Sequence, residues 1–433
     1  MSYSKRLFFD VVAEIIDNRG KTPPLSEAGY PLIEVKHVLP DRIYPVIRNT
    51  KFVDHDIWNN WFRAHLKPGD IIFSTVGSIA RSCITPLDQK FCIAQNLLGF
   101  RIDHSKADPR YVYYAMNGQD FLNEVHGRTI ETVQKSIKIA DLKTCHIPFP
   151  PLSIQKAIAH ILGTLDDKID LIRKMNETFE ILARVVFKSW FVDYDPIRAK
   201  ADGRQSIGMA DEISILFPDS FVDSELGKIP KGWRITTLPD AIEVNPSIPL
   251  RKGTIAKYLE MKNMPTDYAR AIEVYERASG SGAKFLNGDT LLARITPCLE
   301  NGKTAFVDFL QEDEVGWGST EYIVFRPRDP IPKTYAYFLA RSQEFRAFAI
   351  SNMTGTSGRQ RVPANCFENY KIVVPEQKVL EAFGDFSLTL LDYMKSRDEE
   401  STTLSEIRNI LLPKLLKGDI RINEVKEIVE IAT

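Results

Sequence analysis

The sequence of 433 residues contains no run of about 18 apolar residues, which excludes a membrane-spanning helix. Its first ten residues lack a charged segment followed by an apolar one, so we expect no secretory signal and a cytoplasmic protein. An excess of charge is also lacking, because 56 Lys and Arg face 57 Asp and Glu. This balance excludes a protein that coats nucleic acid through bulk positive charge, although it permits local basic patches.

Cysteine is scarce and scattered. The chain has five, with no Cys-x-x-Cys pair: Cys83, Cys92, Cys145, Cys298 and Cys366. This odd number and wide spacing argue against a zinc site and against a disulfide framework, and they fit a reducing cytoplasm. The remaining composition, 44% hydrophobic and 26% charged, is typical of a folded globular protein with room for several domains.

Motifs of self-contained catalysis are missing as well. Residues 245–248 (Asn-Pro-Ser-Ile) lack the second proline and the aromatic residue of an amino-methyltransferase loop. The glycine segments 280–282 and 355–358 match neither a dinucleotide-binding turn nor a P-loop. There is no HExxH, no GxSxG and no clustered set of histidines. We therefore predict a non-catalytic chain that binds no metal or cofactor.

What the sequence does contain is an internal repeat. Four pairs of segments match in the same order along the chain, each at a displacement near 225 residues. The pairs are 33–38 with 259–264, 67–73 with 286–292, 99–101 with 324–326, and 133–135 with 359–361. The displacement of the second pair is 219 residues, whereas that of the other pairs is 225 or 226. This difference indicates insertions in loops.

Each copy reads as a mixed α/β unit. Gly-Asp followed by an apolar run, as at 69–74, predicts a turn that leads into a buried strand. Further strands are expected at 98–102 and 322–326, and short aromatic-rich helices at 111–116 and 335–339. We interpret these aromatic residues as core rather than as platforms for base stacking.

A long helix follows each α/β unit. Alternating steps of four and three residues reach mostly apolar positions over about five heptads, which predicts a coiled-coil seam roughly 54 Å long. The first series is Ile154, Ile158, Ile161, Leu165, Lys168, Ile172, Met175, Phe179, Leu182, Val186 and Ser189. The second is Val379, Phe383, Phe386, Leu390, Tyr393, Arg397, Glu400, Leu404, Ile407, Leu411 and Lys414. The two helices are expected to pack antiparallel on each other; the alternative is that each packs on its own unit.

Together these patterns predict an α+β protein with two tandemly repeated α/β domains, separated by two long antiparallel helices that form a coiled-coil shaft. The expected boundaries are residues 1–150 for the first domain, 151–195 for the first helix, 196–375 for a connector with the second domain, and 376–433 for the second helix and tail.

Over essentially its whole length the chain resembles the specificity subunits of type I restriction-modification systems. The segments that carry the resemblance are 30–36 (YPLIEVK), 67–71 (KPGDI), 148–155 (PFPPLSIQ), 190–196 (WFVDYDP), 228–233 (KIPKGW) and 411–418. The second helix departs from the pattern, since it opens with Pro-Glu-Gln at 375–377. The resemblance implies that each α/β unit is a target-recognition domain for one half of a split DNA site, and that the helices space the halves.

The resemblance also implies the partners. These are double-stranded DNA, two modification (methyltransferase) subunits docked on the helices, and restriction/translocase subunits. S-adenosylmethionine, ATP and Mg²⁺ are expected on those partners and not on this chain. Because the two units differ in sequence, we expect an asymmetric site, whereas identical readers would require a palindrome. The alternatives are a self-contained DNA modification enzyme and a structural coiled-coil protein without a nucleic-acid function.

Polar residues that follow predicted strands are the candidates for DNA contact, because base edges and phosphates bind Arg, Lys, Asn, Gln, Ser and Thr. They are Lys36, His37, Ser74, Thr75, Ser78, Arg81, Gln95, Asn96, Gln134, Lys135, Lys262, Asn263, Arg294, Thr296, Thr356, Ser357, Arg359, Gln360 and Arg361. The strongest candidate is the loop 355–361, whose arginines suit guanine. For any single residue the alternative is a solvated loop position. Glu34 and Glu260 are expected to pair with a nearby lysine.

Overall fold

The computed structural model describes residues 3–18, 20–130, 135–206, 208–356, 358–420, 422 and 425. The chain divides into two compact units: unit 1 is Met1–Arg173 with Glu399–Thr433, and unit 2 is Lys174–Asp398. The two long helices, α5 (Leu152–Phe191) and α11 (Gln377–Lys417), each contribute one part to each unit. The sequence-based boundaries follow the chain in four consecutive segments, whereas each compact unit combines a globular part with parts of both helices.

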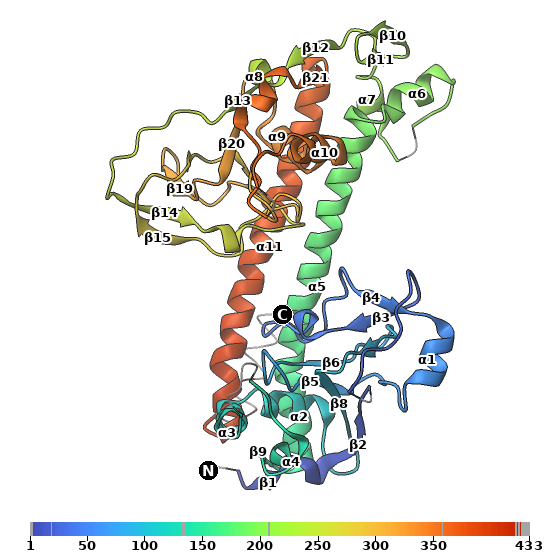
Figure 1. Cartoon of the computed structure of the whole chain (residues 1–433), viewed down its shortest axis with the longest axis vertical. Helices are drawn as coiled ribbons and strands as arrows, with labels where there is room; N and C mark the ends of the chain where they lie inside the picture. Colours follow the sequence, from blue (N-terminus) through green and yellow to red (C-terminus); the bar gives the residue numbers. More distant parts are fainter. Residues whose placement is uncertain are drawn as a thin grey trace. The chain divides into compact units, whose positions relative to one another are not determined.

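Unit 1 contains two sheets and a small strand pair (Figure 1). The first sheet has the order β2 (Val12–Ile16), β8 (Leu97–Ile102), β5 (Ile71–Ser74) and β6 (Ser82–Ile84); the second has the order β4 (Lys51–Val53), β3 (Tyr30–Ile33) and β7 (Cys92–Ile93). Strand β1 (Lys5–Leu7) pairs with β9 (His146–Pro148). The helices are α1 (His55–Trp61), α2 (Pro109–Met116), α3 (Gln119–Gly127) and α4 (Ile139–Leu142).

Unit 2 repeats this arrangement. Its first sheet has the order β13 (Ile242–Val244), β20 (Tyr322–Pro327), β17 (Thr290–Ala293) and β18 (Thr304–Phe306); its second has the order β15 (Tyr275–Ala278), β14 (Ile255–Leu259), β19 (Gly316–Gly318) and β16 (Lys284–Phe285). Strand β12 (Arg234–Thr237) pairs with β21 (Lys371–Val374), as β1 does with β9. The helices are α8 (Leu238–Ala241), α9 (Lys333–Arg341) and α10 (Gln343–Ser351).

A connector precedes the second globular part. It contains α6 (Asp195–Ala201), α7 (Asp211–Ser214) and the hairpin of β10 (Phe221–Ser224) with β11 (Gly227–Pro230). None of the helices in the described ranges combines the length and the apolarity that crossing a membrane requires.

Strand register confirms the repeat that the sequence predicted. Ile72 of β5 lies opposite Gly99 of β8, and Leu291 of β17 lies opposite Val324 of β20. The second sheets also correspond. In unit 1 the pair β3–β7 is parallel and the pair β3–β4 is antiparallel. In unit 2 the pair β14–β19 is parallel and the pair β14–β15 is antiparallel. The predicted fold class, two α/β domains in tandem with two long helices, is confirmed.

The Gly-Asp turn has the same chemistry in both copies. Gly69 and Gly288 have φ values of 85° and 89°, a region that favours glycine. The carboxylate of Asp70 accepts from the Lys67 amide and from Arg101, and that of Asp289 accepts from the Leu286 amide and from Arg326. Burial raises the pKa of both aspartates in spite of these donors. The turn therefore anchors β5 to β8 and β17 to β20.

Within each unit the two long helices run antiparallel. In unit 1 Lys168 pairs with Glu400, and Asp166 accepts from Arg408. In unit 2 Asn176 donates to Asp398, and the rings of Phe187 and Phe383 lie 5.6 Å apart. Residue numbers rise along α5 as they fall along α11, which is the direction that the sequence predicted.

The buried stripe of α5 does not keep a strict period of 3.5 residues. In unit 1 the predicted seam residues Ile158, Leu165 and Ile172 are buried. In unit 2 the buried positions come one residue after the predicted ones, at Asn176, Glu180, Ala183, Phe187 and Trp190. Phe179 and Val186 are half-buried there, and Leu182 is 44% exposed. An α-helix has 3.6 residues per turn, so a stripe with a period of 3.5 drifts around it unless the helix supercoils.

On α11 the predicted seam residues lie in the cores of both units. Phe383 is buried and Leu390 is half-buried in unit 2, while Leu404 and Leu411 are buried in unit 1. Each of these cores also contains residues of the globular part, so the helices pack on each other and on the α/β domains at once. The two packing modes that the sequence left as alternatives therefore coexist.

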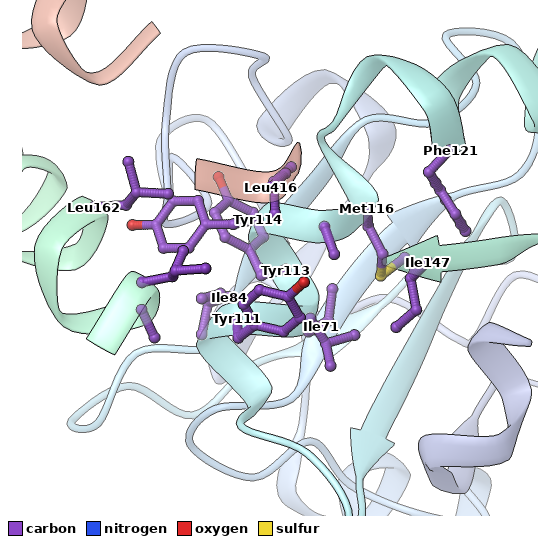
Figure 2. Close-up of a cluster of buried hydrophobic side chains, with 14 of the residues drawn as sticks. Ile71, Ile84, Tyr111, Tyr113, Tyr114, Met116, Phe121, Ile147, Leu162 and Leu416 are labelled. Atoms are coloured by element: carbon purple, nitrogen blue, oxygen red, sulfur yellow. The ribbon is translucent and has the colours of Figure 1, made fainter. Parts of the chain in front are cut away.

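The aromatic residues of the short helices form core, as expected. Figure 2 shows Tyr111, Tyr113 and Tyr114 of α2 clustered with Leu162 of α5 and Leu416 of α11. In unit 2 the corresponding helix α9 buries Tyr335, Tyr337 and Phe338. Each globular part is thereby fixed to the adjoining parts of the long helices.

Candidate nucleic-acid interface

Three loops meet beside the central strands of unit 1. The Thr75 amide, just after β5, donates to the Asn96 carbonyl, just before β8, at 3.0 Å. The third loop joins through the Ile137 amide, which donates to the Thr75 carbonyl, and through the Lys135 carbonyl, which accepts from Gly77. We name residues 75–81, 95–96 and 135–137 loop cluster 1.

Unit 2 reproduces this frame bond for bond. The Arg294 amide donates to the Glu321 carbonyl at 2.9 Å, the Val362 amide to the Arg294 carbonyl at 2.8 Å, and the Thr296 amide to the Gln360 carbonyl at 3.0 Å. We name residues 294–296, 319–321, 354–356 and 358–362 loop cluster 2. Backbone bonds between loops hold each cluster in place, so its side chains are presented from a rigid base.

The shared frame fixes which residues correspond. Thr75 matches Arg294, Asn96 matches Glu321, Lys135 matches Gln360, and Ser136 matches Arg361. The sequence-based pairing of Gln134 with Gln360 and of Lys135 with Arg361 was therefore wrong by one residue. The sequence-based pairing matched residues of similar type. The isolated bridges instead join Ile130 to Ser136 and Thr354 to Arg361, and the loop between the bridged residues is one residue longer in unit 2. Gln134 itself lies outside the described residues.

Several predicted contacts in unit 1 support the loop instead of facing outward. Ser74 is buried: its hydroxyl donates to the Ser78 carbonyl and accepts from the Arg81 amide. The Thr75 hydroxyl donates to the Asn96 carbonyl, and only 9% of Thr75 is exposed. Ser74 and Thr75 are therefore removed from the base-contact candidates, because their hydroxyls are used inside the loop. Ser78 and Gln95 are exposed, and Arg81 and Asn96 are half-exposed.

The candidates after β3 and β14 lie in short 3-10 turns, Val35–His37 and Met261–Asn263. His37 is 4% exposed and accepts from the Glu34 amide, while Asn263 is 6% exposed and donates to Glu273. Burial removes both from the set of direct base contacts. Lys36 pairs with Glu34 at 2.9 Å and Lys262 with Glu260 at 3.0 Å, so the expected internal ion pairs are present.

The loop that was the strongest candidate forms a hairpin between two paired residues. Thr354 and Arg361 exchange both backbone hydrogen bonds, at 2.9 and 2.8 Å. Gly355 has a φ of 123°, and a Cβ there would lie 3.1 Å from the Arg359 carbonyl oxygen, so glycine is required. Thr356 and Arg359 are exposed at the tip, and Gln360 is half-exposed. Ser357 lies outside the described residues.

Arg361 is anchored by an acidic residue of the neighbouring loop. Its Nε lies 2.9 and 3.0 Å from the two carboxylate oxygens of Glu321, and its Nη2 lies 2.8 Å from Oε1. Its Nη1 donates to the Arg359 carbonyl at 3.2 Å. These hydrogen bonds to Glu321 raise the pKa of Arg361. The guanidinium is thus fixed in place, yet 43% of the side chain is exposed.

Glu321 was not among the residues predicted from the sequence. The signal was available, because Glu321 stands at the displacement of 225 from Asn96, which was a candidate. Across the described part of the chain, no group of His, Cys, Asp and Glu is placed to hold a metal ion.

The comparisons with known proteins agree with this architecture. The family model described as "Type I restriction modification DNA specificity domain" matches residues 12–180. The MjaIX specificity subunit of Methanocaldococcus jannaschii is 24% identical over 353 residues, covering 77% of this chain and 75% of the relative. The MjaVIII specificity subunit of the same organism is 22% identical, covering 94% of this chain and 91% of the relative. Over most of its length the chain is therefore similar to type I specificity subunits.

Other specificity subunits match in part or in fold. The EcoAI specificity subunit of Escherichia coli is 30% identical over 209 residues, which cover 47% of this chain and 35% of that subunit. The crystal structure of the S subunit from M. genitalium has the same fold, with a TM-score of 0.52, 15% identity and coverage of 96% of both chains.

Proposed function

We propose that this chain is the non-catalytic subunit that selects the DNA sequence for a type I restriction-modification complex. Each unit reads one half of a split double-stranded site through its loop cluster. The observation that carries this proposal is a frame of three hydrogen bonds, built twice, with different side chains at matched positions. A constant frame with variable side chains is what a reader of variable base sequences requires.

The two halves of the site are expected to differ. Lys135 and Ser136 in unit 1 stand where unit 2 has Gln360 and Arg361, and Asn96 stands where unit 2 has Glu321. These side chains offer different donors and acceptors to the major groove. The site is therefore asymmetric, with two unlike half-sites and a gap between them.

We assign the chemistry to partner subunits. Two modification subunits bring S-adenosylmethionine, and restriction/translocase subunits bring ATP and Mg²⁺. The sequence supports this division, because it carries neither an S-adenosylmethionine turn nor a P-loop. A complex that acts on DNA inside a bacterial or archaeal cell works in the cytoplasm, which is the compartment we propose.

A groove in unit 2 is the surface we propose for a modification subunit. It has a volume of about 1380 Å³ and lies between α5, α11 and the connector. On its α5 side Leu182 and Val185 are 44% and 57% exposed, and Lys378 and Asp385 of α11 also line it. Exposed apolar side chains beside charged ones are typical of a protein interface.

Co-purification tests this surface. The double change L182D with V185D is expected to abolish capture of the modification subunit, while I255D on β14, which is 62% exposed, leaves it intact. Equal capture by both variants would contradict the docking surface without touching the DNA proposal.

Sequencing of methylated DNA tests the function itself. The full chain is expressed with its modification subunit in a host that lacks such systems, and methylated motifs are mapped. We expect one asymmetric split motif with a fixed gap. A palindromic motif, or methylation without sequence preference, would overturn the proposal. Methylation by this chain alone would support a self-contained enzyme instead.

A further inference from the structure

The ion pair of Arg361 and Glu321 leaves two donors of the guanidinium unused. An arginine has five N–H donors: one on Nε and two on each Nη. The carboxylate of Glu321 takes the Nε proton and one on Nη2, and the Arg359 carbonyl takes one on Nη1. One donor therefore remains on each Nη nitrogen.

The two remaining donors belong to a side chain that is partly in solvent. The Arg361 side chain is 43% exposed, whereas Glu321 beneath it is only 24% exposed. Two parallel N–H donors at the end of an arginine match the O6 and N7 acceptors that guanine presents in the major groove. No other base offers two acceptors side by side there.

Both partners are held by backbone. Arg361 is paired with Thr354 across the hairpin, and the Glu321 carbonyl accepts from the Arg294 amide. The Glu321 amide donates to the Ser319 hydroxyl at 3.1 Å. A long, flexible arginine normally loses much conformational entropy when it binds a base. Here most of that ordering is present before DNA arrives.

The charge of Glu321 has a cost that needs an explanation. A carboxylate beside a DNA-binding loop repels phosphates, which weakens binding to every sequence. A gain in selectivity at one base pair offsets that cost, because a fixed fork binds guanine well and fits other bases poorly.

We propose that Glu321 is a positioning residue that presents Arg361 to a single guanine in the half-site read by unit 2. This inference rests on the proposed function and deepens it. Unit 1 has Asn96 and Ser136 at the matched positions and so lacks this fork. The half-site read by unit 1 has no guanine contact of this kind at the equivalent position.

Selection from a randomised double-stranded DNA library tests the proposal. The probe is the full chain bound to its modification subunit, and bound DNA is sequenced. The wild-type complex is compared with R361K, which keeps the charge but loses the fork, and with E321Q, which keeps the shape but loses the charge. R328Q is the matched control, since Arg328 of unit 2 also pairs with a glutamate, Glu243, is 52% exposed and lies outside loop cluster 2.

R361K is expected to lower the preference for guanine at one position of one half-site by about 5- to 150-fold, the range of one bidentate contact. E321Q is expected to lower the base preference at the same position and at no other, while its affinity for unrelated DNA stays equal or rises. R328Q leaves the preference at that position unchanged. Melting curves on each variant check folding, and an exposed ion pair stabilises a fold little.

Three results would overturn the inference. In the first, R361K lowers the guanine preference at one position but E321Q retains the wild-type preference there, so Glu321 has no positioning role. In the second, either variant weakens all sequences equally, which marks a structural or phosphate contact. In the third, R361K changes no base preference. If the wild-type complex itself selects no motif, the proposed function fails, and that outcome is distinct from these three.

Discussion

Arg408 of α11 donates a hydrogen bond of 2.6 Å to Asp166 of α5, across a separation of 242 residues. The second carboxylate oxygen of Asp166 accepts from the Tyr114 hydroxyl of α2, also at 2.6 Å. Asp166 is 3% exposed. One buried carboxylate therefore joins the globular part of unit 1 to both long helices.

Removing this carboxylate is expected to destabilise unit 1 strongly. D166A leaves the charge of Arg408, whose side chain is only 16% exposed, and the Tyr114 hydroxyl without their partner, and the cost of breaking a buried pair is about 3 to 5 kcal/mol. K168A removes the more exposed pair with Glu400 and is expected to cost at most about 1 kcal/mol. Urea unfolding of the two variants measures the difference, and equal losses would refute the anchoring role.

The sequence predicted the helices and their direction but not this anchor. Apolar steps of three and four find the stripe at Ile158, Leu165 and Ile172. They cannot find Asp166, because a buried charge is recognisable only from partners that lie far away in the chain. The shift of the buried stripe of α5 to Asn176 and Glu180 could not be predicted for the same reason, because these buried side chains are polar.

The loop clusters were predictable in position but not in detail. Packing restricts which side chains can occupy the Gly-Asp turns and the strands, so these segments remain similar in the two copies. Their displacement can therefore be found by comparing the sequences of the copies. The hairpin at 354–361 differs in length from its counterpart, so only the hydrogen bonds fix the register of Ser136 with Arg361. Which polar residues face outward depends on loop conformation, and this is why the burial of Ser74 and His37 could not be predicted from the sequence.

Gly355 is expected to be essential for the shape of loop cluster 2. A Cβ there lies 3.1 Å from the Arg359 carbonyl oxygen at a φ of 123°, whereas a Cβ at Gly358 has nothing within 4 Å. G355A should therefore erase the base preferences of one half-site and leave those of the other. G358A costs about 1 kcal/mol for its left-handed φ and keeps the motif. Library selection with both variants checks this, and equal effects would contradict the steric argument.

His37 makes the stability of unit 1 depend on pH. Burial and then the nearby Lys36 lower the pKa of His37 below its usual 6.5, so the folded state favours the neutral ring. Below pH 6.5 the unfolded chain binds the proton more readily than the folded one, and stability is lost as pH falls toward the lowered pKa. At neutral pH this loss is absent.

The change H37N, which introduces the residue found at the matched Asn263, should remove part of this dependence. Melting temperatures between pH 5 and pH 8 should fall less steeply for H37N than for the wild type. H126N, at an exposed position of α3, is the control and should follow the wild type. A parallel curve for H37N would show that His37 does not titrate in this range.

Arg359 is expected to contact a phosphate and not a base. Arg359 is exposed at the tip of the hairpin. The ion pair with Glu321 fixes the side chain of Arg361, and not that of Arg359. R359Q should weaken binding to target and non-target DNA by a similar factor, because phosphates are common to all sequences. It should also reduce the slope of log K against log salt by about 0.9, the value for one released counterion. Titrations at several salt concentrations measure both quantities, and a loss confined to the target sequence would instead place Arg359 on a base edge.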